Sequence, residues 1–223
     1  MQNHTTLCAF FLVFSLLFLS CTNKLATTSS HSSYQSLLTE LQQADTTKPK
    51  ETLGLLNKMV AISKSLPLHE VIIEGEEKTL SIEKGKFLCA LLESSLTKKQ
   101  LDYIYQRADF GSLLIENTSL KNAYLKNIVL VKSYLSEVDL TGADFSNATL
   151  AKTNIINSNL TKANFRKANC RATNFFGSEI TEANFEMTYL REATFEKVIG
   201  NSYLKQINNT SITSITKQEL SSL

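Results

Sequence analysis

Residues 143–170 read ADFSN ATLAK TNIIN SNLTK ANFRK ANC, with the large apolar residue in the third place of each block of five. The same rhythm runs from Phe110 to Phe195: every fifth residue in this stretch, 18 in all, is Leu, Ile or Phe, except Cys170. The residue two places earlier is small in 15 of these 18 repeats. A period of five fits neither a helix nor a flat strand, so the sequence predicts a chain that bends after each short extended piece.

Repeated bends of this kind predict a coil with a filled axis. If each pentapeptide forms one side of a square coil, four pentapeptides make one turn, and the large and small inward side chains pack together along the axis. Backbone pairing between coils about 4.8 Å apart then stabilises the stack. Asn or Asp lies between the two inward positions in nine repeats. Its short side chain suits a bend because it can form a hydrogen bond with a nearby backbone group.

Three blocks carry a resemblance to a known family: AlaAspPheSerAsn at 143–147, AlaAsnPheArgLys at 163–167 and AlaAsnPheGluMet at 183–187. They resemble the A(D/N)LXX motif of the pentapeptide-repeat family, and the similarity covers residues 108–202. The resemblance implies a mainly β fold, a right-handed quadrilateral β-helix.

The N-terminus has the pattern of an export signal. An apolar run of about 14 residues, shorter than the ~20 that a membrane-spanning helix needs, ends at Ser20-Cys21. Phe18-Leu19-Ser20-Cys21 resembles a bacterial lipobox, which implies a signal peptide over 1–20 and lipidation of Cys21. An ordinary cleaved signal and an uncleaved anchor are the alternatives. Thr22, in place of the Asp that retains some lipoproteins at the inner membrane, favours the outer membrane, with the periplasmic or surface face left open.

The segments around the rod have other compositions. Residues 21–36 are rich in Ser, Thr and Asn and are typical of a flexible tether. Residues 37–107 show helical periodicity and a candidate hairpin at Val71–Ile73 and Thr79–Ile82, which predicts a small helical or α+β domain that caps the rod. Residues 203–223 leave the five-residue register, and we expect a C-terminal cap there, which is also a candidate surface for homodimer formation.

Charge and chemistry exclude several classes of function. The formal net charge is +2, and residues 108–202 hold ten basic and ten acidic side chains, so we expect no nucleic-acid partner and no acidic imitation of DNA. The three histidines are scattered, and no phosphate-binding glycine motif is present. The sequence therefore predicts no catalytic residues, no metal site and no cofactor.

Positions 20 apart lie one above another in such a coil, which allows its outer surface to be reconstructed. Apolar residues then form an outward strip with a basic edge, and we expect this face to bind a protein partner. Cover of the strip by the protein's own domain is the alternative. The strip comprises Leu114, Tyr134, Ile156 and Phe176, and the basic edge comprises Lys132, Lys152, Arg171 and Arg191.

The leading interpretation is a non-enzymatic, lipid-anchored envelope protein whose rigid rod serves as an interaction or structural surface for an unidentified protein. One alternative follows from the resemblance: a DNA-mimicking inhibitor that protects a topoisomerase. The export leader and the neutral rod oppose it. A ligand-binding or transport accessory protein that uses the helical domain is a third interpretation.

Overall fold

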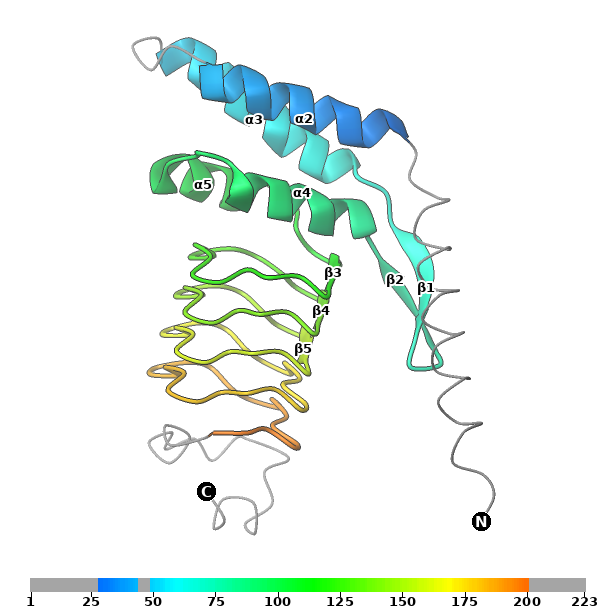
Figure 1. The fold of residues 1–223 in the computed structure, drawn as a ribbon, viewed down its shortest axis with the longest axis vertical. Helices are drawn as coiled ribbons and strands as arrows, with labels where there is room; N and C mark the ends of the chain where they lie inside the picture. Colours follow the sequence, from blue (N-terminus) through cyan, green and yellow to red (C-terminus); the bar gives the residue numbers. More distant parts are fainter. Residues whose placement is uncertain (1–27, 44–48, 201–223) are drawn as a thin grey trace, which may run out of the picture.

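A computed structural model describes residues 28–43 and 49–200 (Figure 1). A layered group of helices covers one end of a rod, and a β-hairpin descends along one side of that rod (Figure 1). The predicted leader with Cys21 and the predicted cap at 203–223 lie outside the described residues.

The rod is a β-helix with a 20-residue turn. Parallel bridges join residues 20 apart, such as Asp139 with Asn159 and Asp144 with Asn164, so each coil holds four pentapeptides. Three short strands stack in register along one side: β3 (Leu114–Glu116), β4 (Tyr134–Ser136) and β5 (Asn154–Ile156). The prediction of a β-helix solenoid preceded by a helical region is confirmed.

The axis of the rod is filled by the large apolar side chains that recur every five residues. Phe165 stacks almost parallel on Phe145 and Phe185, with ring centroids 5.0 and 4.8 Å apart, and Phe175 stacks on Phe195 at 4.8 Å. Rings from adjacent sides of the coil meet edge to face, as in Phe165 and Phe175 at 5.7 Å. Both geometries are favourable for aromatic pairs.

The small inward positions add buried hydrogen bonds between coils. The hydroxyl of Thr173 donates to the carbonyl oxygen of Leu150 at 2.7 Å, and that of Thr188 donates to the carbonyl oxygen of Phe165 at 2.7 Å. These side chains are buried, so their hydroxyls need such partners. Short hydroxylated residues therefore fill the second inward position without leaving polar atoms unsatisfied.

Asn and Asp hold the bends as expected. The side-chain oxygen of Asn164 accepts the backbone N–H of Arg166 at 3.1 Å, and Asp144 accepts that of Ser146 at 3.0 Å. The last residue of most repeats has a left-handed backbone, as in Asn147 (φ 57°) and Lys167 (φ 60°). Polar side chains thus bond the backbone beside each bend.

Four helices form two layers at the N-terminal end of the rod. Helices α2 (Thr28–Gln43) and α3 (Pro49–Ser65) lie above α4 (Ile82–Glu93) and α5 (Lys98–Tyr105), and the lower pair covers the first coil (Figure 1). Helix α2 begins at Thr28, so residues 28–36, which we expected to belong to the tether, are helical. Tyr34 is buried and its ring meets that of Phe87 edge to face at 5.2 Å, which explains the difference: this part of the segment contributes to the core.

Strands β1 (His69–Ile73) and β2 (Glu76–Leu80) form the predicted hairpin. Its turn uses Glu74 and Gly75, both with positive φ. Val71 and Ile73 of β1 and Leu80 of β2 are buried or half-buried, whereas Ile72 is 69% exposed. One face of the hairpin is therefore apolar and covered.

The connection from β2 to α4 adds one more pairing to the rod. Ser81, the N-cap of α4, donates its backbone N–H to the carbonyl oxygen of Ser112 at 2.7 Å and accepts the N–H of Leu114 at 3.0 Å. Gly85, one turn into the helix, lies against the carbonyl group of Leu114. The absence of a side chain at Gly85 allows this close approach.

An ion pair between the buried Lys84 and the exposed Asp109 joins the same junction. The ammonium group of Lys84 donates to the Asp109 carboxylate at 2.7 Å and to the carbonyl oxygen of Gly111 at 3.2 Å. The backbone N–H of Asp109 donates to the hydroxyl of Ser63 at 3.0 Å. Helices α3 and α4 are thus joined to the first turn of the rod, and the helical domain caps the β-helix.

Candidate functional site

The coils place the predicted strip as expected, but the hairpin covers part of it. Leu114 pairs with Tyr134 in the β3–β4 register, and Ile156 lies one coil beyond Ser136. Tyr134 and Ile156 are only 3% and 4% exposed, because they form a small core with Leu80 of the hairpin. The expectation that these two residues are free for a partner is therefore wrong: the alternative, cover by the protein's own domain, holds for them.

The ends of the strip are partly accessible. Leu114 and Phe176 are half-buried and pack against the edge of the small core formed by Leu80, Tyr134 and Ile156. The ammonium group of Lys197 lies over the Phe176 ring, 5.0 Å from its centroid, a distance at which a cation is attracted to the ring face. Leu114 and Phe176 are therefore the residues of the strip that remain partly accessible.

The basic edge separates into two pairs. Arg171 and Arg191 both contact Glu192 at 3.3 Å, so their charge is partly balanced. Lys132 and Lys152 lie on successive coils, and within residues 28–43 and 49–200 neither has a carboxylate within 4.0 Å. The two lysines are thus the unbalanced part of the edge.

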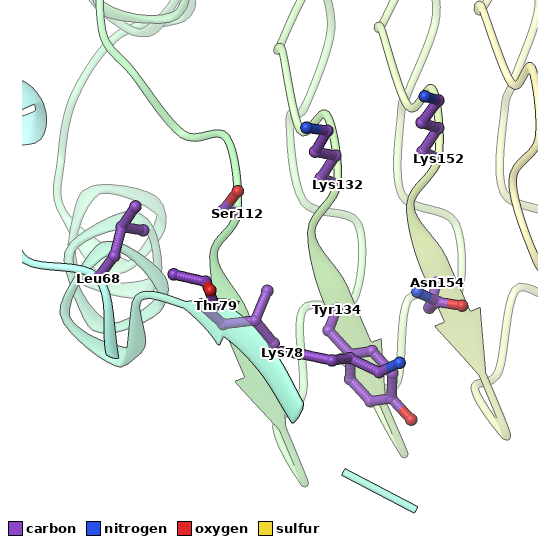
Figure 2. A pocket seen from close by; sticks show the side chains of 9 residues that line it. Leu68, Lys78, Thr79, Ser112, Lys132, Tyr134, Lys152 and Asn154 are labelled. Atoms are coloured by element: carbon purple, nitrogen blue, oxygen red, sulfur yellow. The ribbon is translucent and has the colours of Figure 1, made fainter. Parts of the chain in front are cut away.

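An open pocket of about 360 Å³ lies between the hairpin and this edge. Figure 2 shows Lys132 and Lys152 side by side on successive coils, Ser112 in line with them, and Lys78 extending from β2 toward the rod. The pocket is lined by Leu68, Lys78, Thr79, Leu80, Ser112, Lys132, Tyr134, Lys152 and Asn154. It therefore joins residues from the predicted face with residues of the hairpin.

Acidic residues lie near the covered Tyr134. Burial, together with the negative charges of Glu74, Glu116 and Glu76, raises the pKa of Tyr134 to about 12. Burial and the nearby charge of Glu137 also raise the pKa of Glu116. The covered strip thus has carboxylates as well as lysines in its surroundings.

Potential catalytic and metal-binding groups are dispersed in the described part of the chain. No group of three or more His, Cys, Asp and Glu side chains is close enough there to hold a metal ion. His69 contacts Glu83 at 3.1 Å beside the hairpin. Cys170 is buried in the axis of the rod, and burial raises the pKa of its thiol, so it packs as an apolar residue.

Across residues 28–43 and 49–200, no helix combines enough length with enough apolar character to cross a bilayer.

A family model described as pentapeptide repeats matches residues 118–155, 143–179 and 156–196, in eight copies. The rod carries pentapeptide repeats. The 20-residue bridge register of the rod agrees with this match, and together they support the resemblance to the pentapeptide-repeat family. Pentapeptide-repeat proteins are generally structural or interaction proteins.

Solved structures that include pentapeptide-repeat proteins are similar to this chain. One is Rfr23 from the cyanobacterium Cyanothece 51142, at 29% identity over 41% of this chain and 63% of that one, with a TM-score of 0.39. Another is HetL from Nostoc sp. strain PCC 7120, a protein involved in heterocyst differentiation regulation, at 19% identity over 43% and 42%, with a TM-score of 0.36.

A third similar structure is full-length QnrB1, a plasmid-mediated fluoroquinolone resistance protein, at 13% identity over 52% of this chain and 66% of that one, with a TM-score of 0.27. This chain thus spans less than two thirds of each of these three proteins. No curated protein matches it.

Sequence reasoning gave cover by the protein's own domain as an alternative but did not identify the hairpin as the cover, and it missed the pocket, although the sequence contained a signal for both. Val71, Ile73 and Leu80 give the hairpin one apolar face, and a two-stranded hairpin needs a packing partner for such a face. The outward apolar strip of the rod was the matching surface. Lys78 reaches the pocket only because the hairpin docks there.

Proposed function

We propose that this chain is a non-enzymatic, lipid-anchored protein of the bacterial envelope whose rigid β-helix presents a surface for protein contacts or envelope organisation. The observation that carries the proposal is an apolar leader ending at Ser20-Cys21, joined to a pentapeptide-repeat rod with balanced charge. Acyl chains on Cys21 would hold the protein at the outer membrane, since more than one chain gives stable anchoring.

The proposal includes the shape of the rod. A quadrilateral path is supported by four pentapeptides per 20-residue coil and by a bend at the end of each. The right-handed direction of the path is proposed from the resemblance to the pentapeptide-repeat family alone. Aromatic stacking along the axis and bridges between coils make such a rod stiff. A stiff body suits a role in presenting a surface at a fixed distance from an anchor.

The proposed protein-contact surface is the part of the predicted face that the hairpin leaves open. It comprises Phe176 with Arg171 and Arg191, whose side chains are 48% and 58% exposed. An apolar residue beside arginines is typical of protein interfaces. A partner with an apolar group and nearby carboxylates would fit this surface.

The anchor is tested by labelling cells with radioactive palmitate and separating membranes from soluble protein. Wild-type protein should be labelled and should sediment with the outer membrane, and Cys21→Ser should lose both properties. Cys8→Ser, in the same leader, is the matched control and should behave as wild type. An unlabelled wild-type protein in the cytoplasm would contradict the anchor and favour a soluble role.

The surface is tested by photo-cross-linking in intact membranes from a probe placed beside Phe176. A discrete cross-linked product should form with the wild type and decrease several-fold with Phe176→Ser. Arg166→Ser, an arginine elsewhere on the rod that pairs with Glu186, is the control and should leave the product unchanged. Equal product with Phe176→Ser would show that this surface does not bind.

A further inference from the structure

The pocket beside the hairpin concentrates positive charge. Among its lining residues the charged ones are Lys78, Lys132 and Lys152, and no carboxylate belongs to the lining. Lys78 is paired with Glu76 at 2.7 Å, and its side chain is 25% exposed. The remaining charge comes from Lys132 and Lys152.

These two lysines depart from the charge arrangement of the rod. In two places a basic residue faces an acidic one 20 positions on, Arg166 with Glu186 at 3.3 Å and Lys162 with Glu182 at 3.7 Å. Arg171 is followed 20 positions on by Arg191, but these two arginines share Glu192. Lys132 is followed one coil later by Lys152 with no carboxylate between them, so like charges lie at the same bend of neighbouring coils, about 4.8 Å apart. Such a pair is destabilising by itself. An anion bound between the ammonium groups would balance it.

Other groups around the lysines suit an anionic ligand. The hydroxyls of Ser112 and Thr79 line the pocket and make no hydrogen bond to another residue in the described ranges. Leu80 and Tyr134, both 3% exposed, form an apolar wall that reduces solvent screening on that side. The pocket therefore offers positive charge, free hydroxyl donors and an apolar wall with little exposure to solvent.

We propose that this pocket binds the phosphate group of a small phosphate-bearing ligand, with Lys132 and Lys152 as the charged donors. A phosphate group carries up to two negative charges and three acceptor oxygens, so it can balance both ammonium groups at once. Lysine is a common phosphate ligand that acts as a point charge. A single carboxylate would balance one lysine only. This inference does not depend on the envelope role or on the anchor.

The test is isothermal titration calorimetry of the full chain with inorganic pyrophosphate and, separately, with short-chain dihexanoyl phosphatidate. Saturable binding is expected, weakening as ionic strength rises. The double variant Lys132→Gln/Lys152→Gln should weaken it by about tenfold or more, because two charge-assisted contacts are removed. Circular dichroism and the melting temperature verify that this variant is folded.

The matched control is Lys162→Gln/Lys167→Gln. It removes the same charge from the same place in the repeat, with the same left-handed backbone at φ 60°, outside the pocket lining. Unchanged binding in this control, with loss in the pocket variant, supports the site. Tighter binding of the phosphatidate assigns a lipid headgroup, and tighter binding of pyrophosphate assigns a soluble phosphate compound. Absence of saturable binding to both probes, or equal loss in both variants, overturns the proposal.

Discussion

A methyl group added at Gly85 would lie 1.9 Å from the carbonyl oxygen of Leu114. Helix α4 therefore rests directly on the backbone of strand β3. Because the obstacle is backbone and not a flexible side chain, the helix would have to move as a whole to admit a larger residue. The cap and the rod are fitted to each other at this one position.

Gly85→Ala should consequently destabilise the protein by about 3 kcal/mol, the upper range for overpacking in a core. Urea unfolding followed by circular dichroism measures the change. Gly54→Ala is the matched control: Gly54 lies in helix α3 with nothing within 4 Å, so alanine there should stabilise the helix by up to about 1 kcal/mol. Similar stabilities for the two variants would show that the contact at Leu114 is not tight.

Phe165→Ala should remove the centre of the aromatic stack. Phe165 is fully buried between Phe145 and Phe185, and truncating such a ring costs about 4 kcal/mol. Phe176→Ala, at a half-buried outward position, should cost about 1 kcal/mol. Denaturant midpoints of both variants measure the difference. Equal losses would contradict the assignment of Phe165 to the axis of the coil.

Alkaline pH should weaken the contact between hairpin and rod. Burial raises the pKa of Tyr134 to about 12, above the value of about 10 for an unfolded chain. The neutral phenol is thus favoured in the folded state, so its contribution to stability is complete below pH about 10 and disappears as the pH approaches 12. Melting temperatures between pH 9 and 12 should fall less steeply in Tyr134→Phe than in the wild type.

Tyr189→Phe is the control for this measurement, because Tyr189 is 47% exposed on the rod. It should keep the wild-type dependence on pH. If Tyr134→Phe also keeps it, the phenol of Tyr134 does not titrate with hairpin release.

The rod could be predicted from sequence because one short rule governs every coil. Each repeat requires a large residue such as Phe165 and a small one such as Ala163 to face inward, and this local requirement is visible at every fifth position. Bend residues such as Asn164 follow the same rule and bond the backbone as predicted. The number of residues in a coil then determines which positions stack.

The covered face could not be predicted in the same way. Tyr134 occupies an outward position of the repeat whether water or a hairpin covers it. Its cover comes from Leu80, which lies in the hairpin, outside the repeats. The helical conformation of residues 28–36, which were predicted as tether, could not be predicted either, because it depends on the contact of Tyr34 with Phe87. Contacts between segments whose apolar residues recur at different intervals leave no shared periodic pattern, so they could not be predicted from the sequence in this way.

The backbone bridge between Ser81 and Leu113 also bears on self-association. An open β-helix end exposes peptide groups on which another chain can add its own strand and begin a fibril. Here the N–H of Leu114 is already bonded to Ser81, and α4 lies across the adjacent carbonyl. A second copy therefore finds that docking position occupied, and this end of the molecule acts as a built-in stop against filament growth.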